Sequence, residues 1–362
     1  MARRHPETPR PAQTAVLRWL PMAYLCLLVL VTFTVRVLSL DTLPQSLSLD
    51  ESVDGLDALQ LVRAHWVTPF LQNNFGRETL FLYVQGIALQ LYGVSVFALR
   101  FASVLVGTLT IPLMYAVGRQ LVVEAIPPWL RARTSVGLLA ATGMAVCYWH
   151  LYFSRQALRA ILLPPLLLVM LWCFQRWRQE RPARVAHRWI WLLLAGFLLG
   201  ATQYTYLAAR LVPVLFVMIA LVALVQASPS RRGKAIAGLL VPLGTAALVG
   251  VPLMQYFIRH PQAFAGRTDA IAIPLGGALL AENMLRLLLV QFGGGAWLGH
   301  WPSLNILTGL GLFAGLVVCV RHIRRPGGLL LLTILLTRNC KESRVWPFFP
   351  IRRPDPSPLM SR

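Results

Sequence analysis

Two neighbouring acidic residues, Asp50 and Glu51, lie early in the chain within the stretch Ser48-Leu49-Asp50-Glu51. A carboxylate that is ionised at neutral pH can accept the proton of an attacking hydroxyl group, which is general-base chemistry. The same four residues match a capping box, in which Ser48 and Glu51 exchange hydrogen bonds at the start of a helix. Both interpretations stay open, because a helix cap can also place Asp50 at the mouth of the helix.

Several arginines are suited to bind a phosphate. Arg77 stands just before an apolar stretch, where a guanidinium group can hold a phosphate at the depth of lipid headgroups. The alternative is an ion pair with Glu78 or with a carboxylate of the preceding helix. Arg155, Arg159 and Arg210 fall at the expected external ends of apolar runs, where they either line the same site or anchor those ends in the interface.

The elements that must position these residues are membrane spans. Hydrophobic residues make up 57% of the chain and charged residues only 13%, whereas soluble domains are about a quarter charged. Apolar runs near the roughly 20 residues that cross a bilayer predict about nine spans in an all-α, polytopic helical bundle. These runs are residues 19–40, 101–118, 135–152, 160–174, 189–208, 211–226, 235–256, 303–320 and 327–337.

The basic residues predict the orientation. The net charge is +21, but it comes from short clusters between apolar runs, which argues against nucleic acid as a partner. Clusters of Lys and Arg mark cytoplasmic loops, so we expect a cell-membrane protein with its N-terminus in the cytoplasm. The run at 79–98 then cannot cross, and residues 41–100 form one extracytoplasmic loop. The clusters lie at residues 3–18, 119–133, 176–188, 231–234 and 321–325.

The predicted external loop carries six of the thirteen acidic residues of the chain. At helical spacing, Asp50, Asp54 and Asp57 share one face of a helix, and Leu56 and Leu59 lie on the opposite face. This pattern predicts a juxtamembrane helix with its apolar side on the membrane and its acidic side facing the space for a substrate. The run at 79–98, which contains glutamines and a glycine, is expected to be a juxtamembrane or re-entrant helix.

Short stretches along the chain follow a known order: Leu49 to Ser52, Gly76 to Tyr83, Leu91 to Phe101, Phe153 to Arg159, Gln203 to Tyr206 with Arg210 and Pro213, and Arg259 to Pro261. Their order and spacing resemble membrane glycosyltransferases of the GT-C fold. Within that fold, the chain is similar to the bacterial branch related to dolichyl-phosphate-mannose–protein mannosyltransferases and aminoarabinose transferases. The resemblance covers about residues 15–337.

The resemblance implies a sugar donor linked to polyprenyl phosphate and transfer on the outer face of the membrane. It implies that Asp50, with Glu51 beside it, is the catalytic acidic pair, and that Arg77 contacts the lipid phosphate. The acceptor is open between protein, lipid and glycan. Many relatives carry a second aspartate after the third span, but the loop from Ser154 to Ala160 has none. A divalent metal ion is therefore left open as a cofactor, and the arginines are an electrostatic alternative to it.

Three regions follow from this interpretation: a cytoplasmic segment at 1–18, a transmembrane domain at 19–337, and an atypical polar tail at 338–362. The tail is expected to reflect a truncation or frameshift. Two alternatives to the glycosyltransferase are a transporter or lipid flippase, and an inactive remnant of the enzyme. Transporters place ionisable groups at the bilayer midplane, and the acidic loop favours the enzyme over them.

Overall fold

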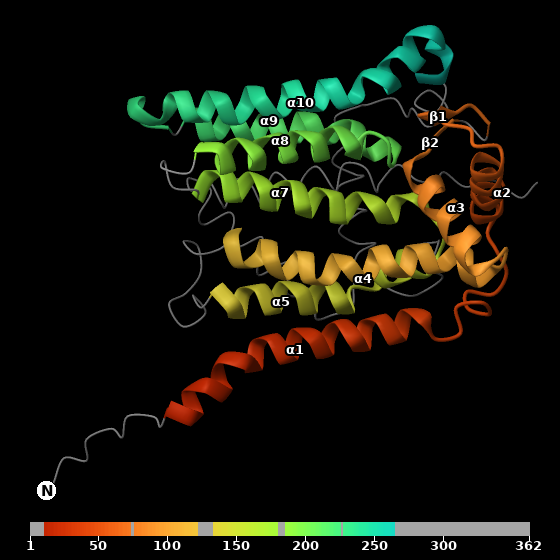
Figure 1. Cartoon of the computed structure of the whole chain (residues 1–362), viewed down its shortest axis with the longest axis horizontal. Helices are drawn as coiled ribbons and strands as arrows, with labels where there is room; N and C mark the ends of the chain where they lie inside the picture. The colour runs from red at the N-terminus through yellow and green to blue at the C-terminus, as the bar shows by residue number, and fades with distance from the viewer. Residues whose placement is uncertain (1–10, 74–75, 122–132, 180–184, 226, 265–362) are drawn as a thin grey trace, which may run out of the picture.

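The computed structural model describes residues 11–73, 76–121, 133–179, 185–225 and 227–264. Its body is a bundle of long helices that run side by side (Figure 1). The predicted all-α, multi-pass membrane fold is confirmed. The helices of the bundle are α1 (Pro11–Val37), α4 (Val96–Leu121), α5 (Arg133–Val146), α6 (Tyr148–Arg155), α7 (Leu163–Gln179), α8 (Val185–Thr202), α9 (Val212–Val225) and α10 (Arg232–Arg259).

Four of the described helical segments are long and apolar enough to cross a membrane, or five if the bent pair α5–α6 counts as one span. The helices of that pair meet at an angle of 58°. The predicted runs at 303–320 and 327–337 lie outside the described residues, as does the tail at 338–362. The total of about nine spans therefore stays a prediction.

One end of the bundle carries the predicted loop. It contains α2 (Leu49–Arg63), the two-residue antiparallel strands β1 (Phe70–Leu71) and β2 (Arg77–Glu78), and α3 (Leu80–Tyr92). At 13 residues, α3 is too short to be counted among the candidate spans. That the run at 79–98 does not cross the membrane stays a prediction. The strand pair is not apparent from the sequence, because two residues per strand leave no alternating pattern to recognise.

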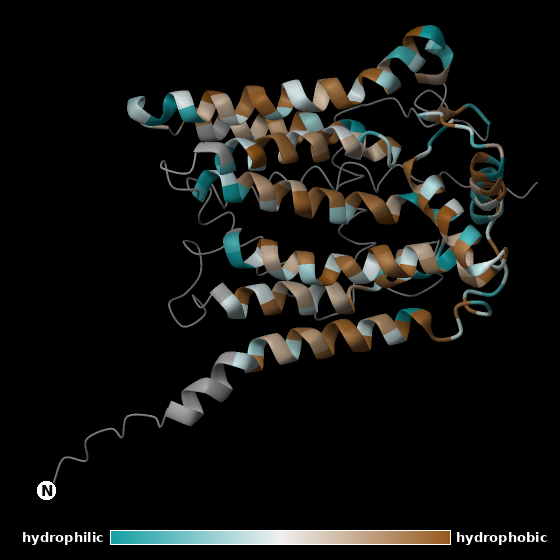
Figure 2. Cartoon of the chain, viewed as in Figure 1, coloured by the Kyte–Doolittle hydropathy of each residue, from teal (hydrophilic) through white to brown (hydrophobic). Residues whose placement is uncertain are grey.

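The two ends of the bundle differ in charge. Helices α4 and α7 both begin beside α2 and end at the opposite side with basic last turns, which carry Arg119 and Arg178. The Lys234 Nζ of α10 donates to the Arg178 carbonyl oxygen at 2.9 Å, which places the start of α10 at that same basic end. Figure 2 shows hydrophilic residues at the ends of the helices and mostly hydrophobic ones between them. Which end faces the cytoplasm stays a prediction.

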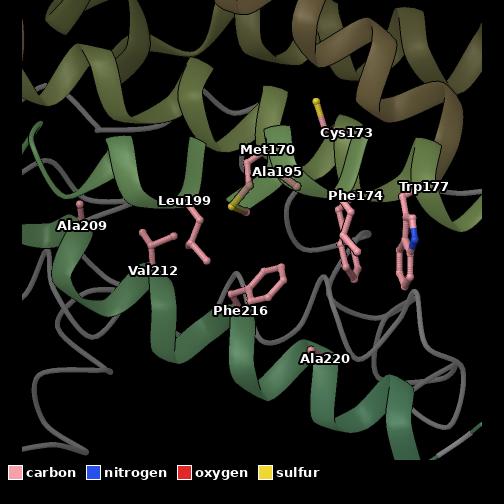
Figure 3. Packing of buried hydrophobic residues seen from close by; sticks show 11 residues of the cluster. Met170, Cys173, Phe174, Trp177, Ala195, Leu199, Ala209, Val212, Phe216 and Ala220 are labelled. Atoms are coloured by element: carbon pink, nitrogen blue, oxygen red, sulfur yellow. The ribbon is translucent and has the colours of Figure 1, made fainter. Parts of the chain in front are cut away.

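Helices α7, α8, α9 and α10 enclose the largest apolar cluster. Met170 and Phe174 of α7 pack with Leu199 of α8 and Phe216 of α9 (Figure 3), and the Phe174 and Phe216 rings are 5.3 Å apart. A glycine, Gly196, lets α8 approach α10, because a Cβ there would lie 2.7 Å from Pro242 of α10. Such close approach of backbones at small residues is how membrane helices gain packing contacts.

Candidate active site

Helix α2 begins with the capping box that the sequence predicts. The Glu51 backbone N–H donates to Ser48 Oγ at 3.2 Å, and the Ser48 N–H donates to Glu51 Oε2 at 3.0 Å. The prediction of a capping box at Ser48 is therefore confirmed. Because the first N–H groups of a helix have no intrahelical partner, this pair of bonds fixes where α2 starts.

Glu51 has a second set of partners that the sequence does not reveal. Its side chain is buried, and Oε1 accepts from Arg100 Nε at 3.0 Å and from the Ala157 backbone N–H at 2.9 Å. Arg100 is completely buried in the first turns of α4. The clue in the sequence is an arginine inside an apolar run, because a charge placed there needs a partner. Glu51 thus joins α2 to α4 and to the segment after α6.

Asp50 is in a different environment from Glu51. Its side chain is exposed at the first turn of α2. It lies near enough to Asp54 for their negative charges to repel. The acidic pair seen in the sequence is therefore divided by the fold: one carboxylate is bonded inside the protein and the other faces outward.

Arg77 lies at the centre of an ion-pair network. Its guanidinium group is completely buried and bridges Asp54 and Asp57 through separate nitrogens. The Asn73 Nδ2 donates to Asp57 Oδ1 at 3.0 Å. Of the two interpretations of Arg77, the structure has the ion pair with the preceding helix. A phosphate contact by Arg77 stays a prediction.

The turn before Arg77 depends on glycine. Gly76 has a φ of 85°, in the left-handed region, and a Cβ on it would lie 2.6 Å from the Phe70 ring. Residues with a side chain rarely adopt that conformation. Gly76 therefore allows β2 to return along β1 and places Arg77 beneath α2.

Two further predicted arginines extend the same network. Arg159, in the 3₁₀ helix Arg159–Leu162, approaches Asp54 at 3.3 Å and Glu78 at 3.6 Å. Arg210, in the 3₁₀ helix Leu207–Leu211, reaches Glu78 at 4.0 Å. Burial raises the pKa of the Asp54 carboxyl above its ordinary value of 3.8, against the opposing effect of Arg159 and Arg77. Three arginines that are distant in sequence thus meet at three carboxylates.

The orientation of α2 differs from the prediction. The acidic side was expected to face open space, but Asp54 and Asp57 are buried against arginines. Leu56 on another side of α2 is 68% exposed, which suits contact with lipid. Hydropathy alone cannot reveal this arrangement, because the buried side is polar and its partners come from elsewhere in the chain.

Arg155 belongs to a separate cluster. Its guanidinium group donates to carbonyl oxygens at and just after the end of α1, including that of Val35 at 2.6 Å and that of Leu38 at 2.7 Å. A cation at a helix C-terminus satisfies carbonyls that have no partner in the helix and opposes the negative end of its dipole. Arg155 therefore fixes the end of α1, and it is not in the network around Arg77.

The carboxylates do not fit a resident divalent metal ion. Within the described ranges, no group of three or more His, Cys, Asp or Glu side chains is arranged to hold a metal. Glu51, Asp54, Asp57 and Glu78 each face at least one arginine. No step of the chemistry proposed below is therefore assigned to a metal ion.

Comparison with known proteins identifies the fold. No protein-family model and no curated protein matches the chain. ArnT from Cupriavidus metallidurans bound to undecaprenyl phosphate aligns with a TM-score of 0.52 at 16% identity, over 90% of this chain and 61% of ArnT. The oligosaccharyltransferase AglB from Archaeoglobus fulgidus, in complex with an inhibitory peptide and a dolichol-phosphate, aligns with a TM-score of 0.58 at 15% identity, over 89% of this chain and 48% of AglB.

The Pmt1–Pmt2 protein O-mannosyltransferase complex of S. cerevisiae bound to the sugar donor aligns with a TM-score of 0.52 at 20% identity, over 67% of this chain and 34% of that chain. The class of the protein follows: it is a multi-pass α-helical membrane protein. Its particular architecture is the GT-C fold of these glycosyltransferases. This chain spans less than two thirds of each of them.

Proposed function

We propose that this protein transfers a sugar from a polyprenyl-phosphate-linked donor to an acceptor on the extracytoplasmic face of the membrane. The fold supports this proposal, because two of the similar structures hold a polyprenyl phosphate and a third holds a sugar donor. The observation that carries it for this chain is Asp50, an exposed carboxylate at the start of α2 beside a buried acid–arginine network.

In this proposal Asp50 is the general base. Its carboxylate takes the proton of the acceptor hydroxyl while that oxygen bonds to the anomeric carbon of the sugar. The bond from that carbon to the phosphate oxygen breaks, and polyprenyl phosphate leaves with the electron pair. Asp50 suits this role better than its neighbours, because it is exposed whereas Asp54 and Asp57 are buried. Glu51 becomes a positioning residue, since it holds the first turn of α2 to Arg100.

The leaving phosphate needs positive charge, and Arg210 is the most open of the network's arginines. Its side chain is 22% exposed, whereas that of Arg159 is 8% exposed and that of Arg77 is fully buried. Its guanidinium group lies over the rings of Phe257 and Phe264, at 5.3 and 4.5 Å from their centroids. We assign Arg210 to the donor phosphate, with Arg159 behind it through their shared partner Glu78. Arg77 pairs with two carboxylates of α2, and Arg155 bonds backbone carbonyls at the end of α1.

The test compares Asp50→Asn with Asp41→Asn, a change of another exposed acid in the same loop. Membranes containing the full chain are supplied with labelled polyprenyl-phosphate sugars, and release of polyprenyl phosphate is measured. Asparagine keeps the size of Asp50 but is not a base, so the rate should fall about 100-fold or more. Asp41→Asn should keep the wild-type rate. Near-normal release by Asp50→Asn would remove it from the mechanism, and no release by the wild type from any such donor would overturn the transferase proposal.

A further inference from the structure

A second candidate site lies at the basic end of the bundle, far from α2. A pocket of about 380 Å³ opens where the end of α7 meets the starts of α8 and α10. Trp177, Arg188, Trp189, Gly233, Lys234 and Ala237 line it. Its volume falls within the range of pockets that hold small ligands. Two indole rings and two cations form its walls.

Glycines shape this pocket. Trp177 is 5% exposed, and it fits against α10 because position 238 is glycine: a Cβ there would lie 2.3 Å from the indole ring. Lys234 then extends over that ring, with its Nζ 5.4 Å from the ring centroid. Gly233 leaves the pocket wall open, since a Cβ on it would meet no atom within 4 Å. The site is therefore built by packing rather than by long side chains meeting in solvent.

Cations gather at the pocket, and no acidic residue of the described ranges lies near them. Lys234 is close enough to Arg178, Arg188 and Arg231 to be repelled by them, and the buried Nε of Arg188 has no hydrogen-bond partner. Within the part of the chain that the structure describes, every acidic residue lies between Asp41 and Glu78, at the opposite end of the bundle. An anion bound here would both accept from Arg188 and relieve the repulsion between these cations.

We propose that this pocket binds the phosphate headgroup of an anionic phospholipid. The basic end lies at the end of membrane-spanning helices, where headgroups are within reach, and its tryptophans are suited to the interface between lipid and water. The charge rule places this end in the cytoplasmic leaflet, where anionic lipids concentrate. The proposal is independent of sugar transfer, because the pocket shares no residue with the site around α2.

The first experiment measures binding of phosphatidylglycerol and of phosphatidylcholine to the purified full chain in detergent by native mass spectrometry. Phosphatidylglycerol should bind more tightly. The double variant Arg188→Gln with Lys234→Gln should bind phosphatidylglycerol about 25-fold more weakly than the wild type, because each cation contributes about fivefold. Arg119→Gln is the matched control, because Arg119 is a cation at the same end of the bundle but outside the pocket. An equal effect of Arg119→Gln would show that only overall charge matters and would overturn the site.

A second variant tests the pocket without changing any charge. Gly233→Leu fills the open wall, and Gly244→Leu adds the same side chain at another open position of α10. Only Gly233→Leu should reduce phosphatidylglycerol binding, and Lys234→Arg should retain it. Unchanged binding by Gly233→Leu would refute the pocket. Glycerol phosphate is the last arm: if it displaces phosphatidylglycerol at equal concentration, the ligand is a free phosphate and the lipid proposal fails.

Discussion

Replacing Arg100 should destabilise this protein more than replacing Asp50, the exposed neighbour of Glu51. Glu51 is the acidic partner of Arg100. The guanidinium group of Arg100 is completely buried and donates to Glu51. It also donates to the backbone carbonyl oxygens of Leu40 at 3.2 Å, Pro44 at 2.9 Å and Ser46 at 2.8 Å. Arg100 therefore holds the loop after α1 and the start of α2 against α4.

The magnitude follows from what each change leaves behind. Arg100→Met keeps much of the apolar stem but leaves the Glu51 charge buried, and breaking a buried pair in this way costs about 3–5 kcal/mol. Glu51→Gln removes the charge but keeps an oxygen for Arg100, so it should cost about 1.5–3 kcal/mol. Asp50→Asn alters an exposed side chain and should stay within about 0.5 kcal/mol. The double variant of Arg100 and Glu51 should cost less than the sum of the two single changes.

Unfolding titrations in mixed detergent micelles would measure these differences on the full chain. Arg119→Met is a suitable control, since Arg119 is an arginine of the same helix that lies at the basic end and has no described acidic partner. It should lower the free energy of unfolding far less than Arg100→Met. Equal losses for Asp50→Asn and Arg100→Met, or strict additivity in the double variant, would refute the division of the acidic pair into an exposed and a structural member.

Three further predictions concern the network and the topology. Arg77→Ala should cost about 3–5 kcal/mol because it strands two buried carboxylates, and Arg77→Lys should cost less; equal unfolding free energies would contradict this. Because burial raises the pKa of Asp54 in the folded protein, the free energy of unfolding of the wild type relative to that of Asp54→Asn should be greatest below pH 3.8 and should decrease as the pH rises through the folded pKa. A difference between the two free energies that grows in favour of the wild type as the pH rises would contradict this. Single cysteines at the exposed positions Ser46 and Gln72 should react with an impermeant thiol reagent in intact cells, whereas one at Ser230 should not; the reverse pattern would invert the topology.

The sequence predicted the bundle because lipid imposes a simple rule on it. Spans must be apolar and about 20 residues long, and basic residues cluster at one set of ends. The capping box at Ser48 was also predictable, since its bonds join residues only three apart. The bend of 58° between α5 and α6 was not, because the apolar run continues across it without a proline or glycine at the break.

The candidate site was only partly predictable. The residues were found by type, and Arg77, Arg159 and Arg210 do meet around Glu78 and Asp54. The pairing of Arg77 with the preceding helix was one of two alternatives, whereas the partners of Arg159 and Arg210 were not found, because these pairs join residues about 80 to 130 positions apart and pairing at such distances depends on packing. For the same reason, hydropathy could not reveal that the acidic side of α2 faces the interior of the protein.

The buried network supports the role proposed for Asp50, because it fixes the helix that carries this residue. Of the four acidic residues of α2, Asp50 alone is exposed, and each of the other three is tied to an arginine from another element. Arg100 ties α2 to α4, Arg77 ties it to β2, and Arg159 ties it to the segment before α7. A helix fixed at several points along its length cannot shift without exposing unpaired charge, which is costly away from water. Such a support is what a reacting carboxylate requires, because small displacements from the productive geometry are costly in rate.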